Sequence, residues 1–190
     1  MNPVKFASVM SLLILLAAPS VFAAEVGLQL TGPGAINDST IKVGEKVTVD
    51  IMFLNDTSWA GFTLGFAISS PDIKRIEHPA DSGNGLNEHG DVKGYNGFDD
   101  RSIWDLAGIF VVPRDWDGEL PELMGFGGVC VKQRYEAHDW EKKLSFDLVV
   151  PEPGTLVIDS AFFPPGGNWL YSAPAHEPVW HGPYQFKVVK

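Results

Sequence analysis

The sequence predicts an all-β protein, an antiparallel jelly-roll-like β-sandwich of about nine strands. Apolar residues recur at every second position through most of the chain, which is the period of a strand that buries one face. Turn signals rich in Gly, Pro, Asn and Asp separate these short runs. Because no segment carries a sustained apolar stripe of helical period, helices are not expected to form a main part of the fold.

The N-terminal residues are expected to be a signal peptide rather than part of the fold. Lys5 is the only charged residue there, an apolar run over 9–18 follows it, and small residues stand at the −3 and −1 positions of a cleavage site before Ala24. The apolar run is too short to span a bilayer, which needs about 20 residues. We therefore expect a cleavable signal peptide over 1–23, no membrane insertion after its removal, and one secreted or periplasmic domain over 24–190.

Two strands are expected to open the domain, a short one over 25–30 and a longer one over 46–54. The turn TGPG ends the first strand, and an Asn-Asp-Thr turn ends the second. Alternation within the second strand places four β-branched or aromatic residues on one face, which is therefore expected to be buried. These residues are Val47, Val49, Ile51 and Phe53.

The next strand, over 59–69, has two unequal faces. The face suited to a core carries Ala60, Phe62, Leu64, Phe66 and Ile68. The opposite face carries Gly61, Thr63, Gly65 and Ala67, which are small side chains for a strand. Gly within a strand often marks a position where a ligand or another backbone approaches closely. Gly61, Thr63 and Gly65 are therefore candidate ligand-binding residues, and the alternative is that the long loop after residue 79 folds over them.

Two irregular stretches divide the rest of the chain. Residues 81–100 are rich in Gly, Asn and Asp, lack an apolar period and are expected to form a long loop. Residues 163–183 form a Pro-rich excursion that contains aromatic residues. Further strands are expected at 102–112, 123–132, 143–150, 155–162 and 184–189.

Two stretches together resemble the cohesin family and its relatives among carbohydrate-binding sandwiches. The first is VGEKVTVDIMFLN followed by AGFTLGFAISSPDI, a strand that ends in a Pro-Asp turn. The second is LSFDLVV followed by PEPGTLVIDSAFF, in which Pro-Gly-Thr separates two strands. The resemblance covers 43–73 and 143–163, whereas 79–130 departs from the family pattern by being longer and more irregular.

The resemblance implies a jelly-roll-like sandwich used for binding without catalysis. Cohesins bind dockerin modules in secreted or cell-surface assemblies, and the related modules bind polysaccharide. We therefore expect a secreted protein module as the partner, with polysaccharide as the alternative. The net charge of −10 arises from scattered acids, which disfavours nucleic acid and anionic membrane surfaces as partners.

Cys130 is the only cysteine, so no intramolecular disulfide can form. Alternation with Val129 and Val131 predicts that it is a small buried hydrophobic residue rather than a reactive thiol.

Metal binding is the alternative interpretation of two polar segments. Loop 81–100 offers carboxylate and amide oxygens of the kind that calcium prefers, but no register matches an EF-hand loop, so a polar loop without a cofactor is expected. In HEPVWH, His176 and His181 are five positions apart and Pro178 interrupts any helix, whereas the zinc-protease motif needs a spacing of four on a helix. A loose site at these two histidines is the alternative to a solvated loop, and no metal ligand is predicted.

Catalysis is not expected. Asp115, Asp117 and Glu119 stand near Trp116 in RDWDGE, and a glycoside-active enzyme built on these acids is the alternative class. Glycoside hydrolysis needs two carboxylates across a cleft, and this segment alone does not supply that arrangement. No G-x-S-x-G elbow or phosphate-binding Gly loop accompanies a strand and helix.

Three tryptophans are candidate ligand-binding residues on loops: Trp116, Trp169 and Trp180. Each stands among Pro, Gly or charged neighbours, and a flat indole can stack on the apolar face of a sugar. The alternative is that each covers an edge of the sandwich. The sequence thus predicts a secreted, non-catalytic protein-binding module, with carbohydrate binding through these tryptophans as the rival within the same fold.

Overall fold

The computed structural model describes most of the chain after the expected signal peptide. The described residues are 24–79, 86–87, 90–91, 94–98, 109–130, 135–136, 138–162, 169–172 and 175–190. The expected signal peptide, 1–23, and most of the expected loop 81–100 lie outside them. All regular secondary structure in the described residues is β, and among them there is no helix that could cross a membrane.

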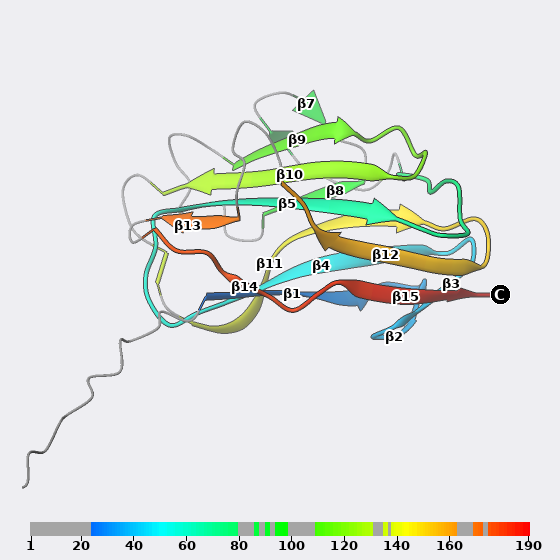
Figure 1. Ribbon diagram of the computed structural model, residues 1–190, viewed down its shortest axis with the longest axis horizontal. Helices are drawn as coiled ribbons and strands as arrows, with labels where there is room; N and C mark the ends of the chain where they lie inside the picture. Colours follow the sequence, from blue (N-terminus) through cyan, green and yellow to red (C-terminus); the bar gives the residue numbers. More distant parts are fainter. Residues whose placement is uncertain are drawn as a thin grey trace, which may run out of the picture.

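Two sheets packed face to face form a sandwich (Figure 1). The five-stranded sheet has the strand order β14-β1-β4-β11-β8. Its strands are β1 (Ala24–Thr31), β4 (Lys46–Asn55), β8 (Tyr95–Phe98), β11 (His138–Val149) and β14 (Val179–Trp180). The pairs β1–β4, β4–β11 and β11–β8 are antiparallel, and the short β14 pairs with β1 in parallel.

The eight-stranded sheet lies in front of the first in Figure 1 and has the order β2-β3-β15-β12-β5-β10-β9, with β13 also paired to β5. Its strands are β2 (Ala35–Asn37), β3 (Thr40–Lys42), β5 (Gly61–Ser69), β9 (Ile109–Asp115), β10 (Glu122–Val129), β12 (Gly154–Ser160), β13 (Leu170–Ser172) and β15 (Tyr184–Val189). A separate two-stranded ladder joins β6 (Leu86–Asn87) and β7 (Gly90–Asp91).

The predicted all-β, jelly-roll-like sandwich is confirmed, with more strands than the about nine expected. The additional strands are two to four residues long, which is too short for alternation to reveal them: β2, β3, β6, β7, β8, β13 and β14. Three of them, β6, β7 and β8, lie within 81–100 and correct the expectation of a loop there, because β8 pairs with β11 as an edge strand of the five-stranded sheet. The expected strand at 102–112 lies mostly outside the described residues, and its end falls within β9.

The core lies between the sheets and follows the predicted faces. Val47, Val49, Ile51 and Phe53 of β4 are all fully buried, as expected. Phe62, Leu64, Phe66 and Ile68 of β5 are also buried and face them from the other sheet. Cys130 is buried as well. Each large apolar side chain removed from water contributes about 1.5–3 kcal/mol before the entropic cost of folding, so this layer is the main source of stability.

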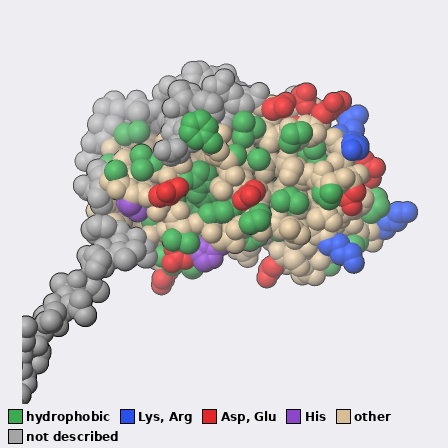
Figure 2. Space-filling view, viewed as in Figure 1, with side chains coloured by type: hydrophobic (Ala, Val, Ile, Leu, Met, Phe, Trp, Pro, Cys, Tyr) green, Lys and Arg blue, Asp and Glu red, His purple; other side chains and the backbone are tan. Residues whose placement is uncertain are grey.

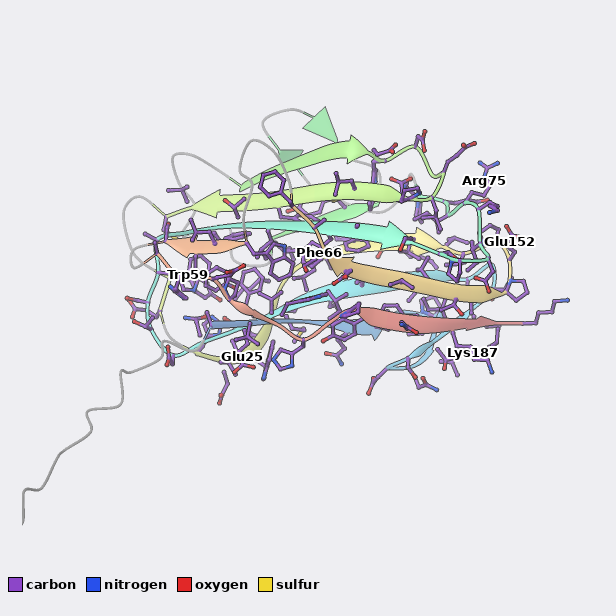
Figure 3. The ribbon with its side chains drawn as sticks, in the orientation of Figure 1. Glu25, Trp59, Phe66, Arg75, Glu152 and Lys187 are labelled. Carbon is purple, nitrogen blue, oxygen red and sulfur yellow. The ribbon has the colours of Figure 1, made fainter. Side chains whose placement is uncertain are left out.

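Ala60 is the exception to the predicted face of the third strand. It is half-buried, and Trp59 beside it is fully buried instead. The reason is that β5 begins at Gly61, so the strand alternation does not yet hold at Ala60. Trp59 packs on the rings of Phe62, Tyr135 and Tyr171 at one end of the core (Figure 3). Burial there raises the pKa of the Tyr171 phenol well above its ordinary value.

A clamp of hydrogen bonds joins the end of β5 to the start of β12. Ser70 Oγ donates to the Thr155 carbonyl at 2.7 Å, and Asp72 Oδ1 accepts from the Thr155 amide at 2.9 Å. Ser70 Oγ also lies 2.9 Å from Asp72 Oδ1, and the Thr155 amide and the Ser70 hydroxyl together hold the pKa of Asp72 below its ordinary value. A Cβ on Gly154 would lie 2.7 Å from Asp72 Oδ1, so glycine is required here. The clamp therefore joins the Pro-Asp turn to the Pro-Gly-Thr turn.

Candidate functional site

Glycine residues of β5 and β10 meet in register on the outer face of the eight-stranded sheet. Gly65 pairs with Gly125, and Thr63 pairs with Gly127. The alternate residues of both strands, such as Phe66 and Phe126, point into the core, so the glycines point outward. We call this surface the glycine strip; it consists of Gly61, Thr63, Gly65, Ala67, Leu123, Gly125, Gly127 and Val129.

The glycine strip carries small or apolar residues. Its glycines are buried, Thr63 is half-buried, and Val129 at its end is 39% exposed. Leu170 of β13, which pairs with Thr63, is also 39% exposed. A Cβ on Gly61 would lie 3.0 Å from the Gly128 carbonyl oxygen and 3.1 Å from Ser172 Oγ, so the neighbouring strands leave no room for a side chain there.

Figure 2 shows the face of the molecule that carries this strip. Hydrophobic side chains are interspersed with backbone over its middle, and acidic side chains are scattered between them. Lys and Arg side chains gather at the right-hand end, the end where Figure 3 labels Arg75 and Lys187. The described side chains in the middle of this face therefore form no continuous basic patch of the kind that an anionic partner would need.

Trp169 and Trp180 lie together beside the glycine strip. β12 leaves the edge of β5 after Ser160, and β13 joins the same edge at Leu170. In the gap between them, the Gly65 carbonyl accepts hydrogen bonds from the Ala161 amide at 2.8 Å and from Trp169 Nε1 at 2.7 Å. The Trp169 indole therefore hydrogen-bonds to the edge of β5 at the position between β12 and β13, where no described strand pairs with it.

A pocket of about 230 Å³ opens next to these rings, and we call it the Trp169 pocket. Its lining includes Trp169, Trp180, Phe162 and Glu177. The two indole rings are 5.0 Å apart, and Trp180 Nε1 donates to Asp159 Oδ1 at 2.8 Å. Because both indole N–H groups already donate hydrogen bonds within the chain, the two tryptophans can offer a ligand only the surface of their rings. Trp169 is 7% exposed, whereas Phe162 is 65% exposed.

Trp116 does not join the other two candidate tryptophans. Its ring stacks on the His78 imidazole at 3.8 Å and meets Phe146 edge-on at 5.8 Å. His78 Nε2 lies 3.3 Å from Glu122 Oε1, and both of these side chains are buried. The Gly118 amide also donates to this carboxylate. Trp116 therefore covers a buried histidine–glutamate pair at the β10 end of the sandwich.

The acids near Trp116 form a turn. Asp117 Oδ1 accepts a hydrogen bond from the Glu119 amide at 2.8 Å, and Asp115, Asp117 and Glu119 are all exposed. The hydrogen bond accounts for Asp117 as a turn residue, which is the common use of Asp in such sequences.

The two histidines of HEPVWH have different partners. The His176 backbone pairs with that of Tyr171, whereas His181 Nε2 lies 2.5 Å from Glu25 Oε2. Within the part of the chain that the structure describes, no group of three or more His, Cys, Asp or Glu side chains could hold a metal ion. The calcium alternative concerns residues 81–100, most of which lie outside that part.

Comparison with known proteins identifies the fold. No family model and no curated protein sequence matches this chain. A cohesin module from a family 33 glycoside hydrolase of Clostridium perfringens superposes with a TM-score of 0.52 at 10% sequence identity, over 88% of this chain and 97% of that module. The fold is a cohesin-like β-sandwich. The resemblance predicted from the two sequence stretches is thus confirmed for the fold.

A type II cohesin domain from the cellulosome of Acetivibrio cellulolyticus also matches the cohesin-like chain. Its TM-score is 0.47 at 14% identity, over 87% of this chain and 94% of that domain.

Sequence reasoning found half of the glycine strip. Gly61, Thr63 and Gly65 stood out as small residues within one strand, but Gly125 and Gly127 gain meaning only from their pairing across to β5. The spacing of glycines in MGFGGV was the available signal. Phe162 carried no signal, because an apolar residue at the end of a strand is indistinguishable in sequence from a core residue.

Proposed function

We propose that this protein is an exported, non-catalytic binding module that engages a protein partner through the glycine strip. The observation that carries the proposal is the in-register pairing of glycines between β5 and β10 beside the exposed apolar side chains of Val129 and Leu170. Exposed apolar side chains that gather on one face mark interaction sites on soluble proteins. The signal-peptide pattern of residues 1–23 supports a partner outside the cytoplasm.

A protein is the partner that fits this surface best. The backbone groups of the strip are paired in the sheet, so the strip offers a ligand contact area rather than hydrogen bonds. Protein interfaces combine apolar with polar groups, and Figure 2 shows acidic side chains scattered among the apolar side chains of this face. The cohesin-like fold supports the same class of partner, since the cohesin resemblance implies a dockerin-like module.

Carbohydrate binding at the Trp169 pocket is the second candidate function. The observation that favours it is that two of the three candidate tryptophans and the exposed Phe162 line one pocket. A sugar ring would have to stack on Phe162 and Trp180, because Trp169 is nearly inaccessible.

Thr63→Arg tests the protein-binding proposal. The immobilised protein is used to capture partners from the extracellular fraction of its source, alongside Thr63→Arg and a matched control, Ile36→Arg. Ile36 lies on β2 and is 52% exposed, so its replacement changes the same charge away from the strip. We expect the wild type and the control to retain one partner protein and Thr63→Arg to lose it, since a long charged side chain would lie across the glycine strip.

Retention of the same partner by Thr63→Arg, at an unchanged melting temperature, would contradict the proposal. Depletion of the wild type by insoluble polysaccharide, abolished by Phe162→Ala, would instead support the Trp169 pocket as the binding site.

A further inference from the structure

A second pocket, of about 340 Å³, lies at the β1 edge of the five-stranded sheet. We call it the Trp140 pocket. Its size is within the range of about 300–1,000 Å³ that is usual for small-molecule sites. The side chains that matter for its chemistry belong to Gln29, Asp38, Trp140, His181 and Tyr184, and its floor is Gly27.

Gly27 makes the pocket possible. Its neighbour Val26 and the paired Phe53 are buried, so Gly27 faces outward from β1. A Cβ at this position would lie 3.0 Å from Tyr184 Oη and 3.4 Å from Trp140 Cζ3. The absence of a side chain therefore lets Trp140 of β11 and Tyr184 of β15, which belong to different sheets, approach the same strand.

Trp140 supplies an exposed aromatic surface that its neighbours hold in place. The indole is 40% exposed, in contrast to the buried Trp59 and Trp169. The His181 imidazole meets it edge-on at 5.3 Å, and His181 Nε2 in turn lies 2.5 Å from Glu25 Oε2. Figure 3 places Glu25 along β1 at the edge of the sandwich. The imidazole is thus fixed between a carboxylate and the indole, which orients Trp140 without covering it.

Tyr184 contributes a hydroxyl rather than a second platform. Its ring packs against Trp180 at 5.3 Å and Phe186 at 6.0 Å, and its Oη is the atom that would lie nearest to a Cβ at Gly27. The pocket therefore combines one exposed ring with the Tyr184 hydroxyl, the Gln29 amide and the Asp38 carboxylate. Lys and Arg are absent from the described residues that line it, so an anionic ligand would find no counter-charge among them.

These features match a ligand with one apolar face and hydroxyl groups around its edge. We propose that the Trp140 pocket binds a neutral pyranose unit of a glycan, whose ring stacks on Trp140 and whose hydroxyls hydrogen-bond with Gln29, Asp38 and Tyr184. A quaternary ammonium ligand fits less well, because such cations are bound by several rings around one centre and this pocket exposes one. The site is separate from the glycine strip, so the module would hold a glycan at one edge and a protein on the outer face of the other sheet.

The test is affinity electrophoresis of the purified protein through gels that contain soluble β-glucan, xylan or galactomannan. We expect at least one polysaccharide to retard the wild type, and Trp140→Ala to weaken that retardation by roughly tenfold or more, as loss of a stacked aromatic side chain does. Ile36→Ala is the control, since it removes an exposed apolar side chain of β2 that lines neither the Trp140 pocket nor the Trp169 pocket. This control is expected to migrate like the wild type.

Two further variants keep the test sharp if Trp140→Ala is poorly folded. Gln29→Leu removes an exposed hydrogen-bonding group at similar volume, and Gly27→Ala fills the floor; both are expected to weaken retardation. The proposal is overturned if no polysaccharide retards the wild type or if the folded variants at 140, 29 and 27 all migrate like the wild type. It is also overturned if choline chloride, but not the matching monosaccharide, releases the protein.

Discussion

The outer faces of the two sheets differ in whether their side chains already have partners. On the five-stranded sheet, Thr48 Oγ1 donates to Asp147 Oδ1 at 2.6 Å, and Thr31 Oγ1 donates to Asp50 Oδ2 at 2.8 Å. Both carboxylates are buried even though they lie on the outer side of the sheet. On the eight-stranded sheet, the glycine strip has few side chains and no comparable network. These outward-facing polar groups of the first sheet already have partners within the chain, whereas the glycine strip has few side chains that would compete with a partner.

Cross-strand pairing explains the polar face. Thr48 of β4 stands directly opposite Asp147 of β11, at a separation where opposite side chains interact strongly. Asn96 Nδ2 donates to the same Asp147 Oδ1 at 2.8 Å, and Lys46 Nζ lies 3.4 Å from its other oxygen. A partner that docked here would have to replace these bonds, and a partner on the glycine strip would not. This is why the strip, and not the network, is the proposed interface.

The largest expected effect comes from placing a carboxylate on the side of β4 that faces the core. Val49→Asp places a carboxylate on the core side of β4, where Val49 is fully buried, whereas native Asp50 one position later faces outward to Thr31. An unpaired buried charge costs more than about 4 kcal/mol, which is most of the stability of a typical domain. Thermal unfolding followed by circular dichroism is expected to show no cooperative transition for this variant.

Met52→Asp is the matched control for Val49→Asp. Met52 lies on the outer side of the same strand, opposite Lys142, so its variant is expected to stay folded and to lose about 1 kcal/mol or less. A cooperative transition for Val49→Asp at the wild-type temperature would mean that the two faces of β4 are inverted.

The next effect in size tests the network itself. Asp147→Ala leaves the Thr48 hydroxyl and the Asn96 amide without their acceptor and removes the counter-charge of Lys46. We therefore expect the free energy of unfolding to fall by about 3 kcal/mol in urea titrations. Thr63→Ala on the glycine strip is the control, with an expected change within about 0.5 kcal/mol. Equal losses of unfolding free energy in both variants would mean that the outer faces of the two sheets do not differ in how strongly their side chains are bonded.

The features that the sequence predicts are those that depend only on the alternation of inward and outward side chains along a strand. Val47, Val49, Ile51 and Phe53 could be assigned to the core because β4 runs without a break. β11 is different, since bulges between His138 and Glu141 and between Lys142 and Leu144 shift its alternation. Trp140 lies within the first of these irregularities, so its exposure and its place beside Gly27 could not be inferred from its position in the sequence.

The candidate site was less predictable because it is made by contacts between distant segments. Trp169 was selected for its Pro- and Gly-rich surroundings, but its hydrogen bond to the Gly65 carbonyl spans 104 positions and depends on the gap between β12 and β13. Trp116 was selected by the same reasoning, yet it stacks on His78. Neighbouring residues in sequence therefore do not distinguish a tryptophan that lines a pocket from one that covers a buried polar pair.

The smallest expected effect concerns the clamp that ties β5, the central strand beneath the glycine strip, to β12. The Thr155 amide and the Ser70 hydroxyl lower the pKa of Asp72 below its ordinary value of 3.8 in the folded protein. A carboxyl group with a lowered folded-state pKa stabilises the fold above its unfolded pKa, and this contribution is lost as the pH falls through the folded value. Asp72→Asn keeps an oxygen for the Thr155 amide but removes the charge, so its melting temperature should lie below that of the wild type at pH 7.

The test compares the melting temperatures of the wild type and Asp72→Asn at each pH. Every other carboxylate titrates in both proteins, so its effect cancels in this difference. The melting-temperature gap is expected to be present at pH 7, to narrow as the pH falls below about 4 and to vanish near pH 2. Glu152→Gln, an exposed acid in the turn before Gly154 that Figure 3 labels, is the control for the loss of one negative charge nearby. A gap for Asp72→Asn that stays constant down to pH 2 would mean that the clamp acts through shape alone. In that case the charge of Asp72 contributes nothing to holding β5, which carries half of the glycine strip, against β12.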